Sequence, residues 1–202
     1  MDYDDTFRGA PASGIDIGKW DARHREFWTE RLGRRYLLAV VPTRARRGRI
    51  LEIGAAWYNK YQKQVVGPGN ELTIIDIKEP DSPDLLAIEG LDRYVKFDMT
   101  RPDGAPADLA SAFDEIRSWG VLSHYGFTAE QCRIYLDNVA AFLKPGGQVI
   151  FKLDIDTHKR VKQPGSGTVE FLENLIRERF TIRHSDTLSG NTPGHVHYVE
   201  KR

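Results

Sequence analysis

The segment Arg49–Tyr61 constrains the fold most, because it joins a short apolar run, a glycine and the start of a helical pattern. The apolar run consists of Ile50, Leu51 and Ile53. A run of this kind, without regular polar alternation, is typical of a parallel strand that is covered on both faces. Gly54 follows at once and permits a sharp turn or the close approach of a ligand, and the next helix then offers free N–H groups. We therefore expect a strand, a tight turn and a helix, which is the repeating unit of an α/β fold.

Short apolar segments of the same kind recur along the chain. The further segments expected to contribute strands are 71–76, 94–98, 113–124 and 148–154, followed by a terminal hairpin of 180–184 and 195–201. Thr128 and Gln131 have the spacing of a capping box and predict a helix that begins there. A last helix is expected from Thr168 to Phe180. The predicted fold is a three-layer α/β sheet, mostly parallel, with an antiparallel strand from the C-terminal hairpin and additional N-terminal helices.

Composition limits the classes of partner. The 202 residues, 40% hydrophobic and 29% charged, suit one globular domain, with an N-terminal arm and helices over 1–46 and a core over 47–202. Lys plus Arg and Asp plus Glu number 29 each, so no net field favours nucleic acid or an anionic membrane. The single cysteine, Cys132, excludes an internal disulfide, and no segment has the roughly 20 apolar residues that span a bilayer. We expect a cytoplasmic protein with a small-molecule partner, and neither nucleic acid nor membrane.

An acidic residue ends the second predicted strand. Asp76 lies 22 positions after Gly54. Nucleotide-binding βαβ units place a carboxylate at about this spacing, where it accepts hydrogen bonds from ribose hydroxyls. Asp98 follows the third strand in the same way, and the structural alternative for both residues is to cap a turn. We predict that Asp76 binds a ribose.

Several motifs resemble one enzyme family. Glu52, a spacer and Gly54 resemble the first motif of the class I S-adenosylmethionine (SAM) dependent methyltransferases, although Ala56 and Tyr58 stand where the family usually has further glycines. The phrase Leu-Lys-Pro-Gly-Gly over 143–147, directly before a strand, is also similar to this family. A third similarity is carried by Phe113, Asp114, Val121, Leu122 and His124. The resemblance implies a Rossmann-like core over 47–202 and SAM as the cofactor.

The resemblance also implies which residues surround the cofactor. Asp98 would accept from the adenine amino group, Met99 would cover the ring, and Ser118–Gly120 would line the wall near the methionine part. Aromatic rings at Trp57 and Tyr58 would favour the sulfonium cation. The expected cofactor-binding residues are Glu52, Gly54, Ala55, Ala56, Trp57, Tyr58, Asp76, Ile77, Asp98, Met99, Ser118, Trp119 and Gly120.

Methyl transfer from a sulfonium is an in-line displacement, so alignment of the reactants can supply most of the catalysis. An acceptor that starts protonated also needs a base, for which His124 is the first candidate, followed by His158 and Asp154. Helices before the first motif often cover the substrate in this family. The expected substrate-binding residues are Trp20, Phe27, Trp28 and Tyr125. The interpretation is O- or N-methylation of a small molecule, such as a specialised metabolite.

Other readings stay open. A metal ion could be held by His184, His195 and His197 on the terminal hairpin, or by Asp154, Asp156 and His158, but we predict no metal. A SAM-dependent cyclisation that releases methylthioadenosine is a second enzymatic function. A third reading is an interaction protein that keeps the fold without turnover. Aromatic residues in the N-terminal helices suit a homodimer.

Overall fold

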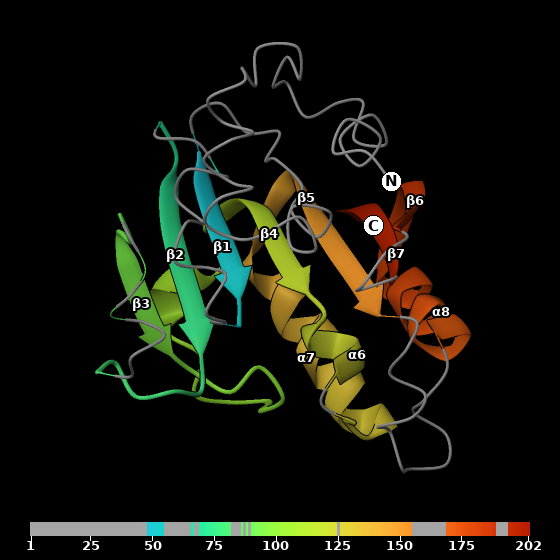
Figure 1. Cartoon of the computed structure of the whole chain (residues 1–202), viewed down its shortest axis with the longest axis horizontal. Coiled ribbons are helices and arrows are strands. Elements are labelled where there is room, and N and C mark those ends of the chain that lie inside the picture. Colours follow the sequence, from blue (N-terminus) through green and yellow to red (C-terminus); the bar gives the residue numbers. More distant parts are fainter. Residues whose placement is uncertain are drawn as a thin grey trace.

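The computed structural model describes residues 48–54, 66, 69–81, 86, 88, 90–124, 126–154, 169–188 and 194–202. Within this part of the chain, seven strands form one sheet in the order β3-β2-β1-β4-β5-β7-β6. The strands are β1 (Arg49–Ile53), β2 (Glu71–Asp76), β3 (Arg93–Lys96), β4 (Phe113–Trp119), β5 (Leu143–Asp154), β6 (Phe180–Leu188) and β7 (Gly194–Lys201). The first five pair in parallel, whereas β7 runs antiparallel to both β5 and β6. The arrows of β1, β2, β4 and β5 therefore point to the same edge of the sheet, at the bottom of Figure 1.

The sheet is buried on both faces because its central strands are apolar on both sides. Leu51 and Ile53 of β1 point to one face, where they join a core with the helices α7 (Ala129–Phe142) and α8 (Val169–Arg179). Ile50 of β1 points to the opposite face and packs with Leu72 and Ile74 of β2. Farther along this second face, a separate cluster comprises Trp119, Ile150, Val196 and Tyr198. The apolar run at Ile50–Ile53 thus fills both layers, as its lack of alternation predicts.

Helix α7 begins at the predicted capping box. The Thr128 hydroxyl accepts from the backbone N–H of Gln131 at 3.2 Å, and the Gln131 side chain accepts from the backbone N–H of Thr128 at 2.9 Å. These two bonds satisfy N–H groups that a helix start leaves without a partner. The buried residues of α7 are Cys132, Tyr135, Leu136, Val139 and Phe142, and the helix ends where the chain enters β5. A short helix α6 (Val121–His124) and a 3-10 turn η3 (Ala107–Leu109) complete the described elements.

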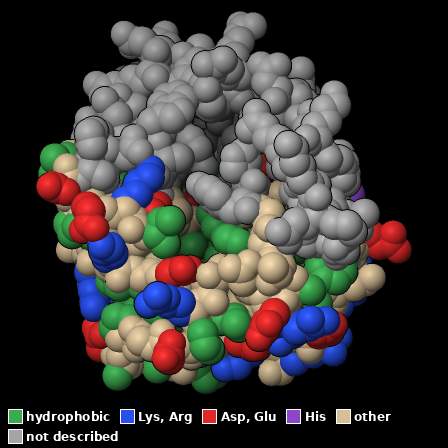
Figure 2. Space-filling view, turned by 90° about the horizontal axis from the view of Figure 1, so that it is seen from below, with side chains coloured by type: hydrophobic (Ala, Val, Ile, Leu, Met, Phe, Trp, Pro, Cys, Tyr) green, Lys and Arg blue, Asp and Glu red, His purple; other side chains and the backbone are tan. Residues whose placement is uncertain are grey.

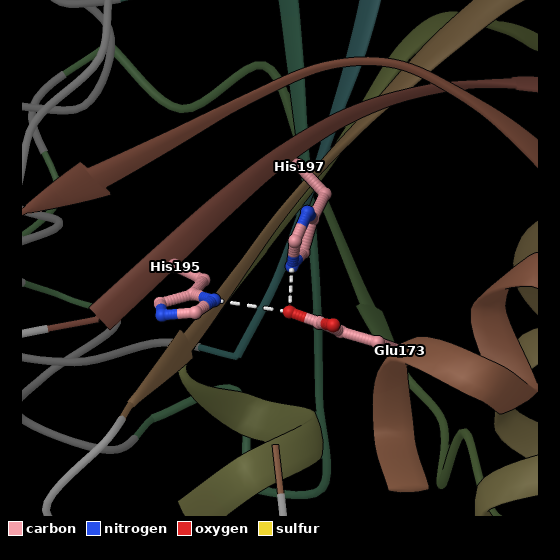
Figure 3. Close-up of side chains that lie close together, drawn as sticks. All are labelled: Glu173, His195 and His197. Atoms are coloured by element: carbon pink, nitrogen blue, oxygen red, sulfur yellow. Dashed lines mark hydrogen bonds and ion pairs between the residues drawn. The ribbon is translucent and has the colours of Figure 1, made fainter. Parts of the chain in front are cut away.

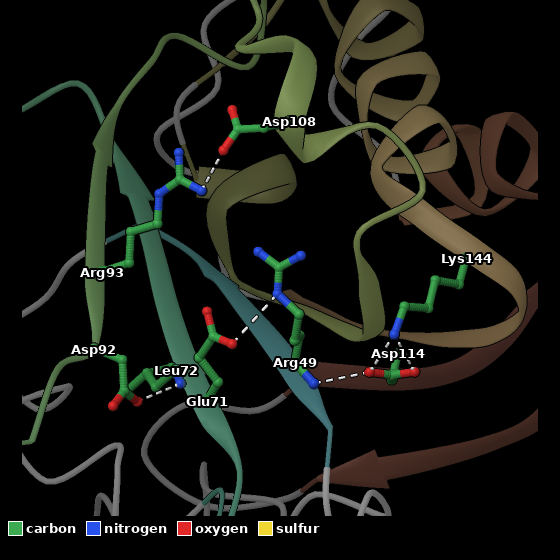
Figure 4. A network of polar contacts seen from close by, with 8 residues as sticks. All are labelled: Arg49, Glu71, Leu72, Asp92, Arg93, Asp108, Asp114 and Lys144. Atoms are coloured by element: carbon green, nitrogen blue, oxygen red, sulfur yellow. Dashed lines mark hydrogen bonds and ion pairs between the residues drawn. The ribbon is translucent and has the colours of Figure 1, made fainter.

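Hydrogen bonds and ion pairs link the amino-terminal ends of the strands to one another (Figure 4). The Asp114 carboxylate accepts from the backbone N–H of Arg49 at 2.8 Å and from the Lys144 ammonium at 2.8 and 2.9 Å. Burial alone would raise the pKa of Asp114, but these donors hold the pKa below its usual value. A second contact joins β2 to the start of β3: the Leu72 N–H donates to Asp92, the residue before β3, at 2.7 Å. These contacts stabilise the edge opposite the strand exits.

The predicted fold is confirmed, including the antiparallel strand near the C-terminus. One expectation was wrong: the segment 113–124 is not a single strand. Strand β4 ends at Trp119, and Gly120, with a φ of 77°, turns the chain into α6. No helix in the described residues has both the length and the apolar character needed to cross a bilayer. The predicted N-terminal arm and helical lid, 1–46, lie outside the described residues.

Candidate functional site

The strand order reverses between β1 and β4, and each of these strands is followed directly by a glycine with a positive φ. Open α/β sheets bind ligands outside the carboxyl ends of the strands at such a reversal. Gly54 has a φ of 89°, and its N–H donates to the Ile75 carbonyl oxygen at 2.8 Å. A Cβ at this position would lie 2.8 Å from Val121 Cγ2, so backbone conformation and space both require glycine. Seen from this edge, hydrophobic side chains are visible in a recess near the centre of the molecule (Figure 2).

Asp76 ends β2 at the same edge. Its Oδ1 accepts from the Lys78 N–H at 3.0 Å, which tightens the turn after the strand. The Tyr94 hydroxyl lies 2.5 Å from the Lys78 carbonyl oxygen and 3.1 Å from the Asp76 carbonyl oxygen, so it holds the same turn. Burial, together with the Asp76 and Glu79 carboxylates, raises the pKa of Tyr94 to about 12 and keeps this hydroxyl a donor. Ile77 follows with 65% of its surface exposed, an apolar side chain beside a carboxylate.

Asp98 and Met99 follow β3. The Asp98 Oδ1 accepts from the Thr100 N–H at 2.9 Å and from the Thr100 hydroxyl at 2.7 Å, so the turn-capping contact is formed. The Met99 side chain is only 5% exposed and belongs to the core between the sheet and α7. Its carbonyl oxygen accepts from the Asn138 side chain at 3.0 Å. Contact of either residue with an adenine ring stays a prediction.

Glu52, two residues before Gly54 on β1, belongs to a buried group of charges. Its Oε2 lies 3.2 Å from Arg117 Nε, and Glu115 Oε1 lies 3.8 Å from Arg117 Nη1. All three side chains are at most 2% exposed. Burial raises the pKa of Glu52 to about 8, while Arg117 acts in the opposite direction. Glu52, predicted to bind the cofactor, thus has its carboxylate in this buried charge group, two residues before Gly54.

The wall formed by residues 118–120 has two sides. The Ser118 hydroxyl faces α7, where it lies 2.7 Å from the Tyr135 hydroxyl. Burial raises the pKa of Tyr135 well above its usual value, so that hydroxyl keeps its proton. Trp119 points to the opposite face, and the Arg117 guanidinium lies 5.5 Å from its ring centre. Gly120 has a positive φ and follows the last residue of β4, so it lies at the carboxyl edge of the sheet.

The exit of β5 meets the exit of β4. The Gly120 N–H donates to the Lys152 carbonyl oxygen at 3.0 Å, and a Cβ on Gly120 would lie 2.6 Å from Asp154 Oδ2. The Asp154 carboxylate forms an ion pair with the buried Lys152 ammonium. The Asp154 N–H donates to the Ser123 hydroxyl at 2.9 Å. Asp154, a predicted base, is thus brought to the same edge as the two glycines and is oriented by Lys152.

The remaining predicted residues lie in α6 or outside the described part of the chain. His124 is the last residue of α6. The expected site residues outside the described part of the chain are Trp20, Phe27, Trp28, Ala55, Ala56, Trp57, Tyr58, Tyr125 and His158. Asp156, part of one metal alternative, is also outside it.

Sequence reasoning missed the buried charges Arg117 and Lys152. Both sit inside apolar strand segments, where an unpaired charge would be costly. A charged residue inside an apolar strand segment was the sequence signal that could have predicted a buried ion pair. The partner of Arg117, Glu52, comes from the neighbouring strand β1, whereas the partner of Lys152, Asp154, lies two residues later on the same strand.

Comparison with known proteins supports the fold alone. No protein-family model and no curated protein matches the sequence. Among solved structures, the PH0226 protein from Pyrococcus horikoshii matches with a TM-score of 0.61 and 16% identity, over 94% of this chain and 95% of that one. The N-methyltransferase NodS from Bradyrhizobium japonicum matches with a TM-score of 0.57 and 19% identity, over 93% and 99%.

A third match is the 1,6-didemethyltoxoflavin-N1-methyltransferase from Burkholderia thailandensis, with bound 1,6-didemethyltoxoflavin and S-adenosylhomocysteine. Its TM-score is 0.56 and its identity 20%, over 98% of this chain and 88% of that one. The chain therefore has the fold of the class I SAM-dependent methyltransferases.

Proposed function

We propose that the chain binds SAM at the carboxyl edge of β1, β2, β3 and β4 and transfers its methyl group to a small-molecule acceptor. The observation that carries this proposal is the pair of strand exits at the reversal of strand order. Gly54 and Gly120 both have positive φ values there, and Asp76 with the exposed Ile77 ends the adjoining strand. NodS and the toxoflavin enzyme, which share the fold, are methyltransferases by name.

The residues present fit an adenosyl ligand. The Asp76 carboxylate suits a ribose diol, and Ile77 offers apolar surface to an adenine ring. Gly54 permits the tight turn at the exit of β1, because its φ is positive and a Cβ there would meet Val121. Asp98 is the proposed acceptor for the adenine amino group. When bound, SAM supplies an electrophilic methyl group.

The chain's own contribution is alignment of the acceptor and, where needed, removal of its proton. Alignment of reacting atoms can contribute about 7 to 11 kcal/mol to catalysis. His124 is the first proposed base, and His158 and Asp154 are the others. The ion pair with Lys152 fixes the Asp154 carboxylate beside Gly120, at the exit of β4. The proposed substrate contacts remain Trp20, Phe27, Trp28 and Tyr125.

Thermal unfolding with SAM, with S-adenosylhomocysteine, with NAD and without ligand tests the cofactor. A ligand at a hundredfold its dissociation constant adds about 2.7 kcal/mol, or roughly 5 to 10 °C for a domain of this size. We expect both adenosyl ligands to raise the midpoint and NAD to leave it unchanged. Asp76→Asn should reduce this shift, whereas the matched variant of the exposed Asp103, Asp103→Asn, should keep it. Stabilisation by NAD alone would contradict the proposal.

Product analysis tests the reaction. S-adenosylhomocysteine as product supports methyl transfer, whereas methylthioadenosine indicates cyclisation of the aminocarboxypropyl arm. Binding without consumption of SAM in any acceptor mixture indicates an interaction protein. Size exclusion with light scattering tests the proposed homodimer, and a gel shift with DNA or RNA tests the proposed lack of nucleic-acid binding.

A further inference from the structure

Three side chains of types that can bind metals meet between α8 and β7, beside the exit of β5, where Leu153 lies opposite His195 and Asp154 lies opposite Gly194. Glu173 comes from α8, and His195 and His197 come from β7. Glu173 Oε1 lies 3.0 Å from His195 Nδ1 and 3.0 Å from His197 Nε2. One ligand atom from each residue lies within 4.8 Å of the other two. The two rings and the carboxylate point toward one another (Figure 3).

The fold fixes this arrangement from the backbone outward. Residues two apart on a strand share a face, so His195 and His197 both point toward α8. In the ladder they lie opposite Leu153 and Phe151 of β5, which belong to the core on that face. Because β7 is paired on both sides, its two histidines stand on a strand held by hydrogen bonds at both edges.

The two histidines differ in exposure in a way that suits an ion near the surface. The His197 side chain is 3% exposed, Glu173 is 16% exposed and His195 is 37% exposed. An ion between them would be held from inside by His197 and would keep a coordination position toward solvent beside His195.

A fourth residue orients the buried histidine. The Ser185 hydroxyl, on β6 opposite His197, lies 2.8 Å from His197 Nδ1. This contact occupies one ring nitrogen and leaves Nε2 as the atom that faces Glu173. Histidines that bind metals almost always have their other nitrogen held by a hydrogen-bonding group in this way.

The buried His197 Nε2 is the observation that points to a ligand. It lies 3.0 Å from the Glu173 carboxylate, yet within the described residues the geometry at Nε2 does not form a hydrogen bond. A ring nitrogen that points beside a carboxylate oxygen is expected when both bind one ion. Tetrahedral zinc bonds of about 2.0 to 2.2 Å place neighbouring nitrogen and oxygen ligands about 3.3 to 3.6 Å apart. The observed separations of 3.0 Å are slightly shorter than this, and the one between His195 Nδ1 and Glu173 Oε1 is a hydrogen bond, so an ion would take the place of that bond and move the side chains apart by a few tenths of an ångström.

We propose that Glu173, His195 and His197 bind a divalent transition-metal ion, with zinc as the best match to two imidazoles and one carboxylate. Imidazole favours zinc and neighbouring transition metals over magnesium and calcium, which prefer oxygen ligands. Three protein ligands leave a fourth, open position, as in sites that bind water or a substrate. The proposed site differs from the three-histidine alternative on the terminal hairpin. His184 lies opposite Tyr198, on the other face of the sheet, so it cannot join His195 and His197. Glu173 is the third proposed ligand instead.

The direct test is titration of the full-length, tag-free chain with zinc after removal of metal by a chelator and dialysis. Isothermal calorimetry should show one zinc ion per chain, and magnesium should show no saturable binding. Cobalt substituted for zinc should give a visible absorption band. His195→Gln and Glu173→Gln should each weaken zinc binding at least tenfold, and Ser185→Ala should weaken it about 10- to 100-fold.

His184→Asn is the matched control, since it removes a histidine from the same sheet but from the other face. It should keep the stoichiometry and affinity of the wild type. His195→Gln serves as the main variant because His195 is the most exposed ligand, and circular dichroism in chelator checks that each variant is folded. Three results would each overturn the proposal and leave a hydrogen-bonded Glu173–His195 pair. The first is no saturable zinc binding, and the second is unchanged zinc affinity in both His195→Gln and Glu173→Gln. The third is an equal loss of zinc affinity in His184→Asn. The test does not depend on SAM, so its result is independent of the proposed methyl transfer.

Discussion

Replacing Glu52 by Gln tests the buried charge group that Glu52 forms with Arg117 and Glu115. One guanidinium, Arg117, faces the carboxylates of Glu52 and Glu115 at 3.2 and 3.8 Å. Ionising both carboxylates would leave a net negative charge in a region that water does not reach. Desolvation therefore raises the pKa of Glu52 from 4.5 to about 8, and the attraction of Arg117 offsets only part of this.

The raised pKa fixes the sign of the pH dependence. The folded chain keeps a proton on Glu52 that the unfolded chain releases near pH 4.5. The stability contributed by this proton is fully present below pH 4.5 and is lost as the pH rises through about 8. The complete change corresponds to about 5 kcal/mol in the free energy of unfolding. This amount is comparable to the whole stability of a marginal domain.

Urea unfolding of the wild type and of Glu52→Gln, from about pH 5 to about pH 9, measures this effect. The wild type should lose stability relative to Glu52→Gln as the pH rises, because glutamine has no proton to release. Glu130→Gln, at an exposed position of α7, should give a curve parallel to that of the wild type. If the Glu52→Gln curve is also parallel, Glu52 is ionised throughout and the reasoning is wrong.

Three further substitutions test local structure. Gly120→Ala should destabilise the fold by about 1 to 3 kcal/mol and weaken SAM binding, because the φ of Gly120 is 77° and the added Cβ would lie 2.6 Å from Asp154 Oδ2. Urea denaturation measures the loss of stability and calorimetry the loss of SAM affinity. Wild-type values in both measurements would contradict the prediction. Tyr135→Phe leaves the buried Ser118 hydroxyl without its 2.7 Å partner and should cost about 1 to 3 kcal/mol in urea unfolding, so an unchanged midpoint counts against this contact. Thr128→Ala removes the capping box of α7 and should cost about 1 kcal/mol, seen as a lower thermal midpoint; a midpoint equal to that of the wild type would show that the cap contributes nothing.

The strands and the start of α7 could be predicted because their signals are local. Strand β2 has the bounds expected from its apolar run, and the Thr128–Gln131 spacing identified the helix start. Where the expectation failed, at 113–124, the deciding residue was Gly120, whose left-handed backbone ends the strand. Its apolar neighbours Val121 and Leu122 continue the hydrophobic run, so composition alone suggested a longer strand.

By itself, the sequence determined the succession of α/β units, the glycine at the exit of β1 and the acids that end β2 and β5. These features follow from residue type and spacing within a few neighbours. Only the tertiary structure decided which distant side chains meet: Arg117 with Glu52, and Glu173 with His195 and His197. In the sequence Glu173 is one more polar residue on an amphipathic helix, since nothing local shows which strand that helix covers. Helix packing on β7 brings its carboxylate within 3.0 Å of two histidines that are more than 20 positions away along the chain.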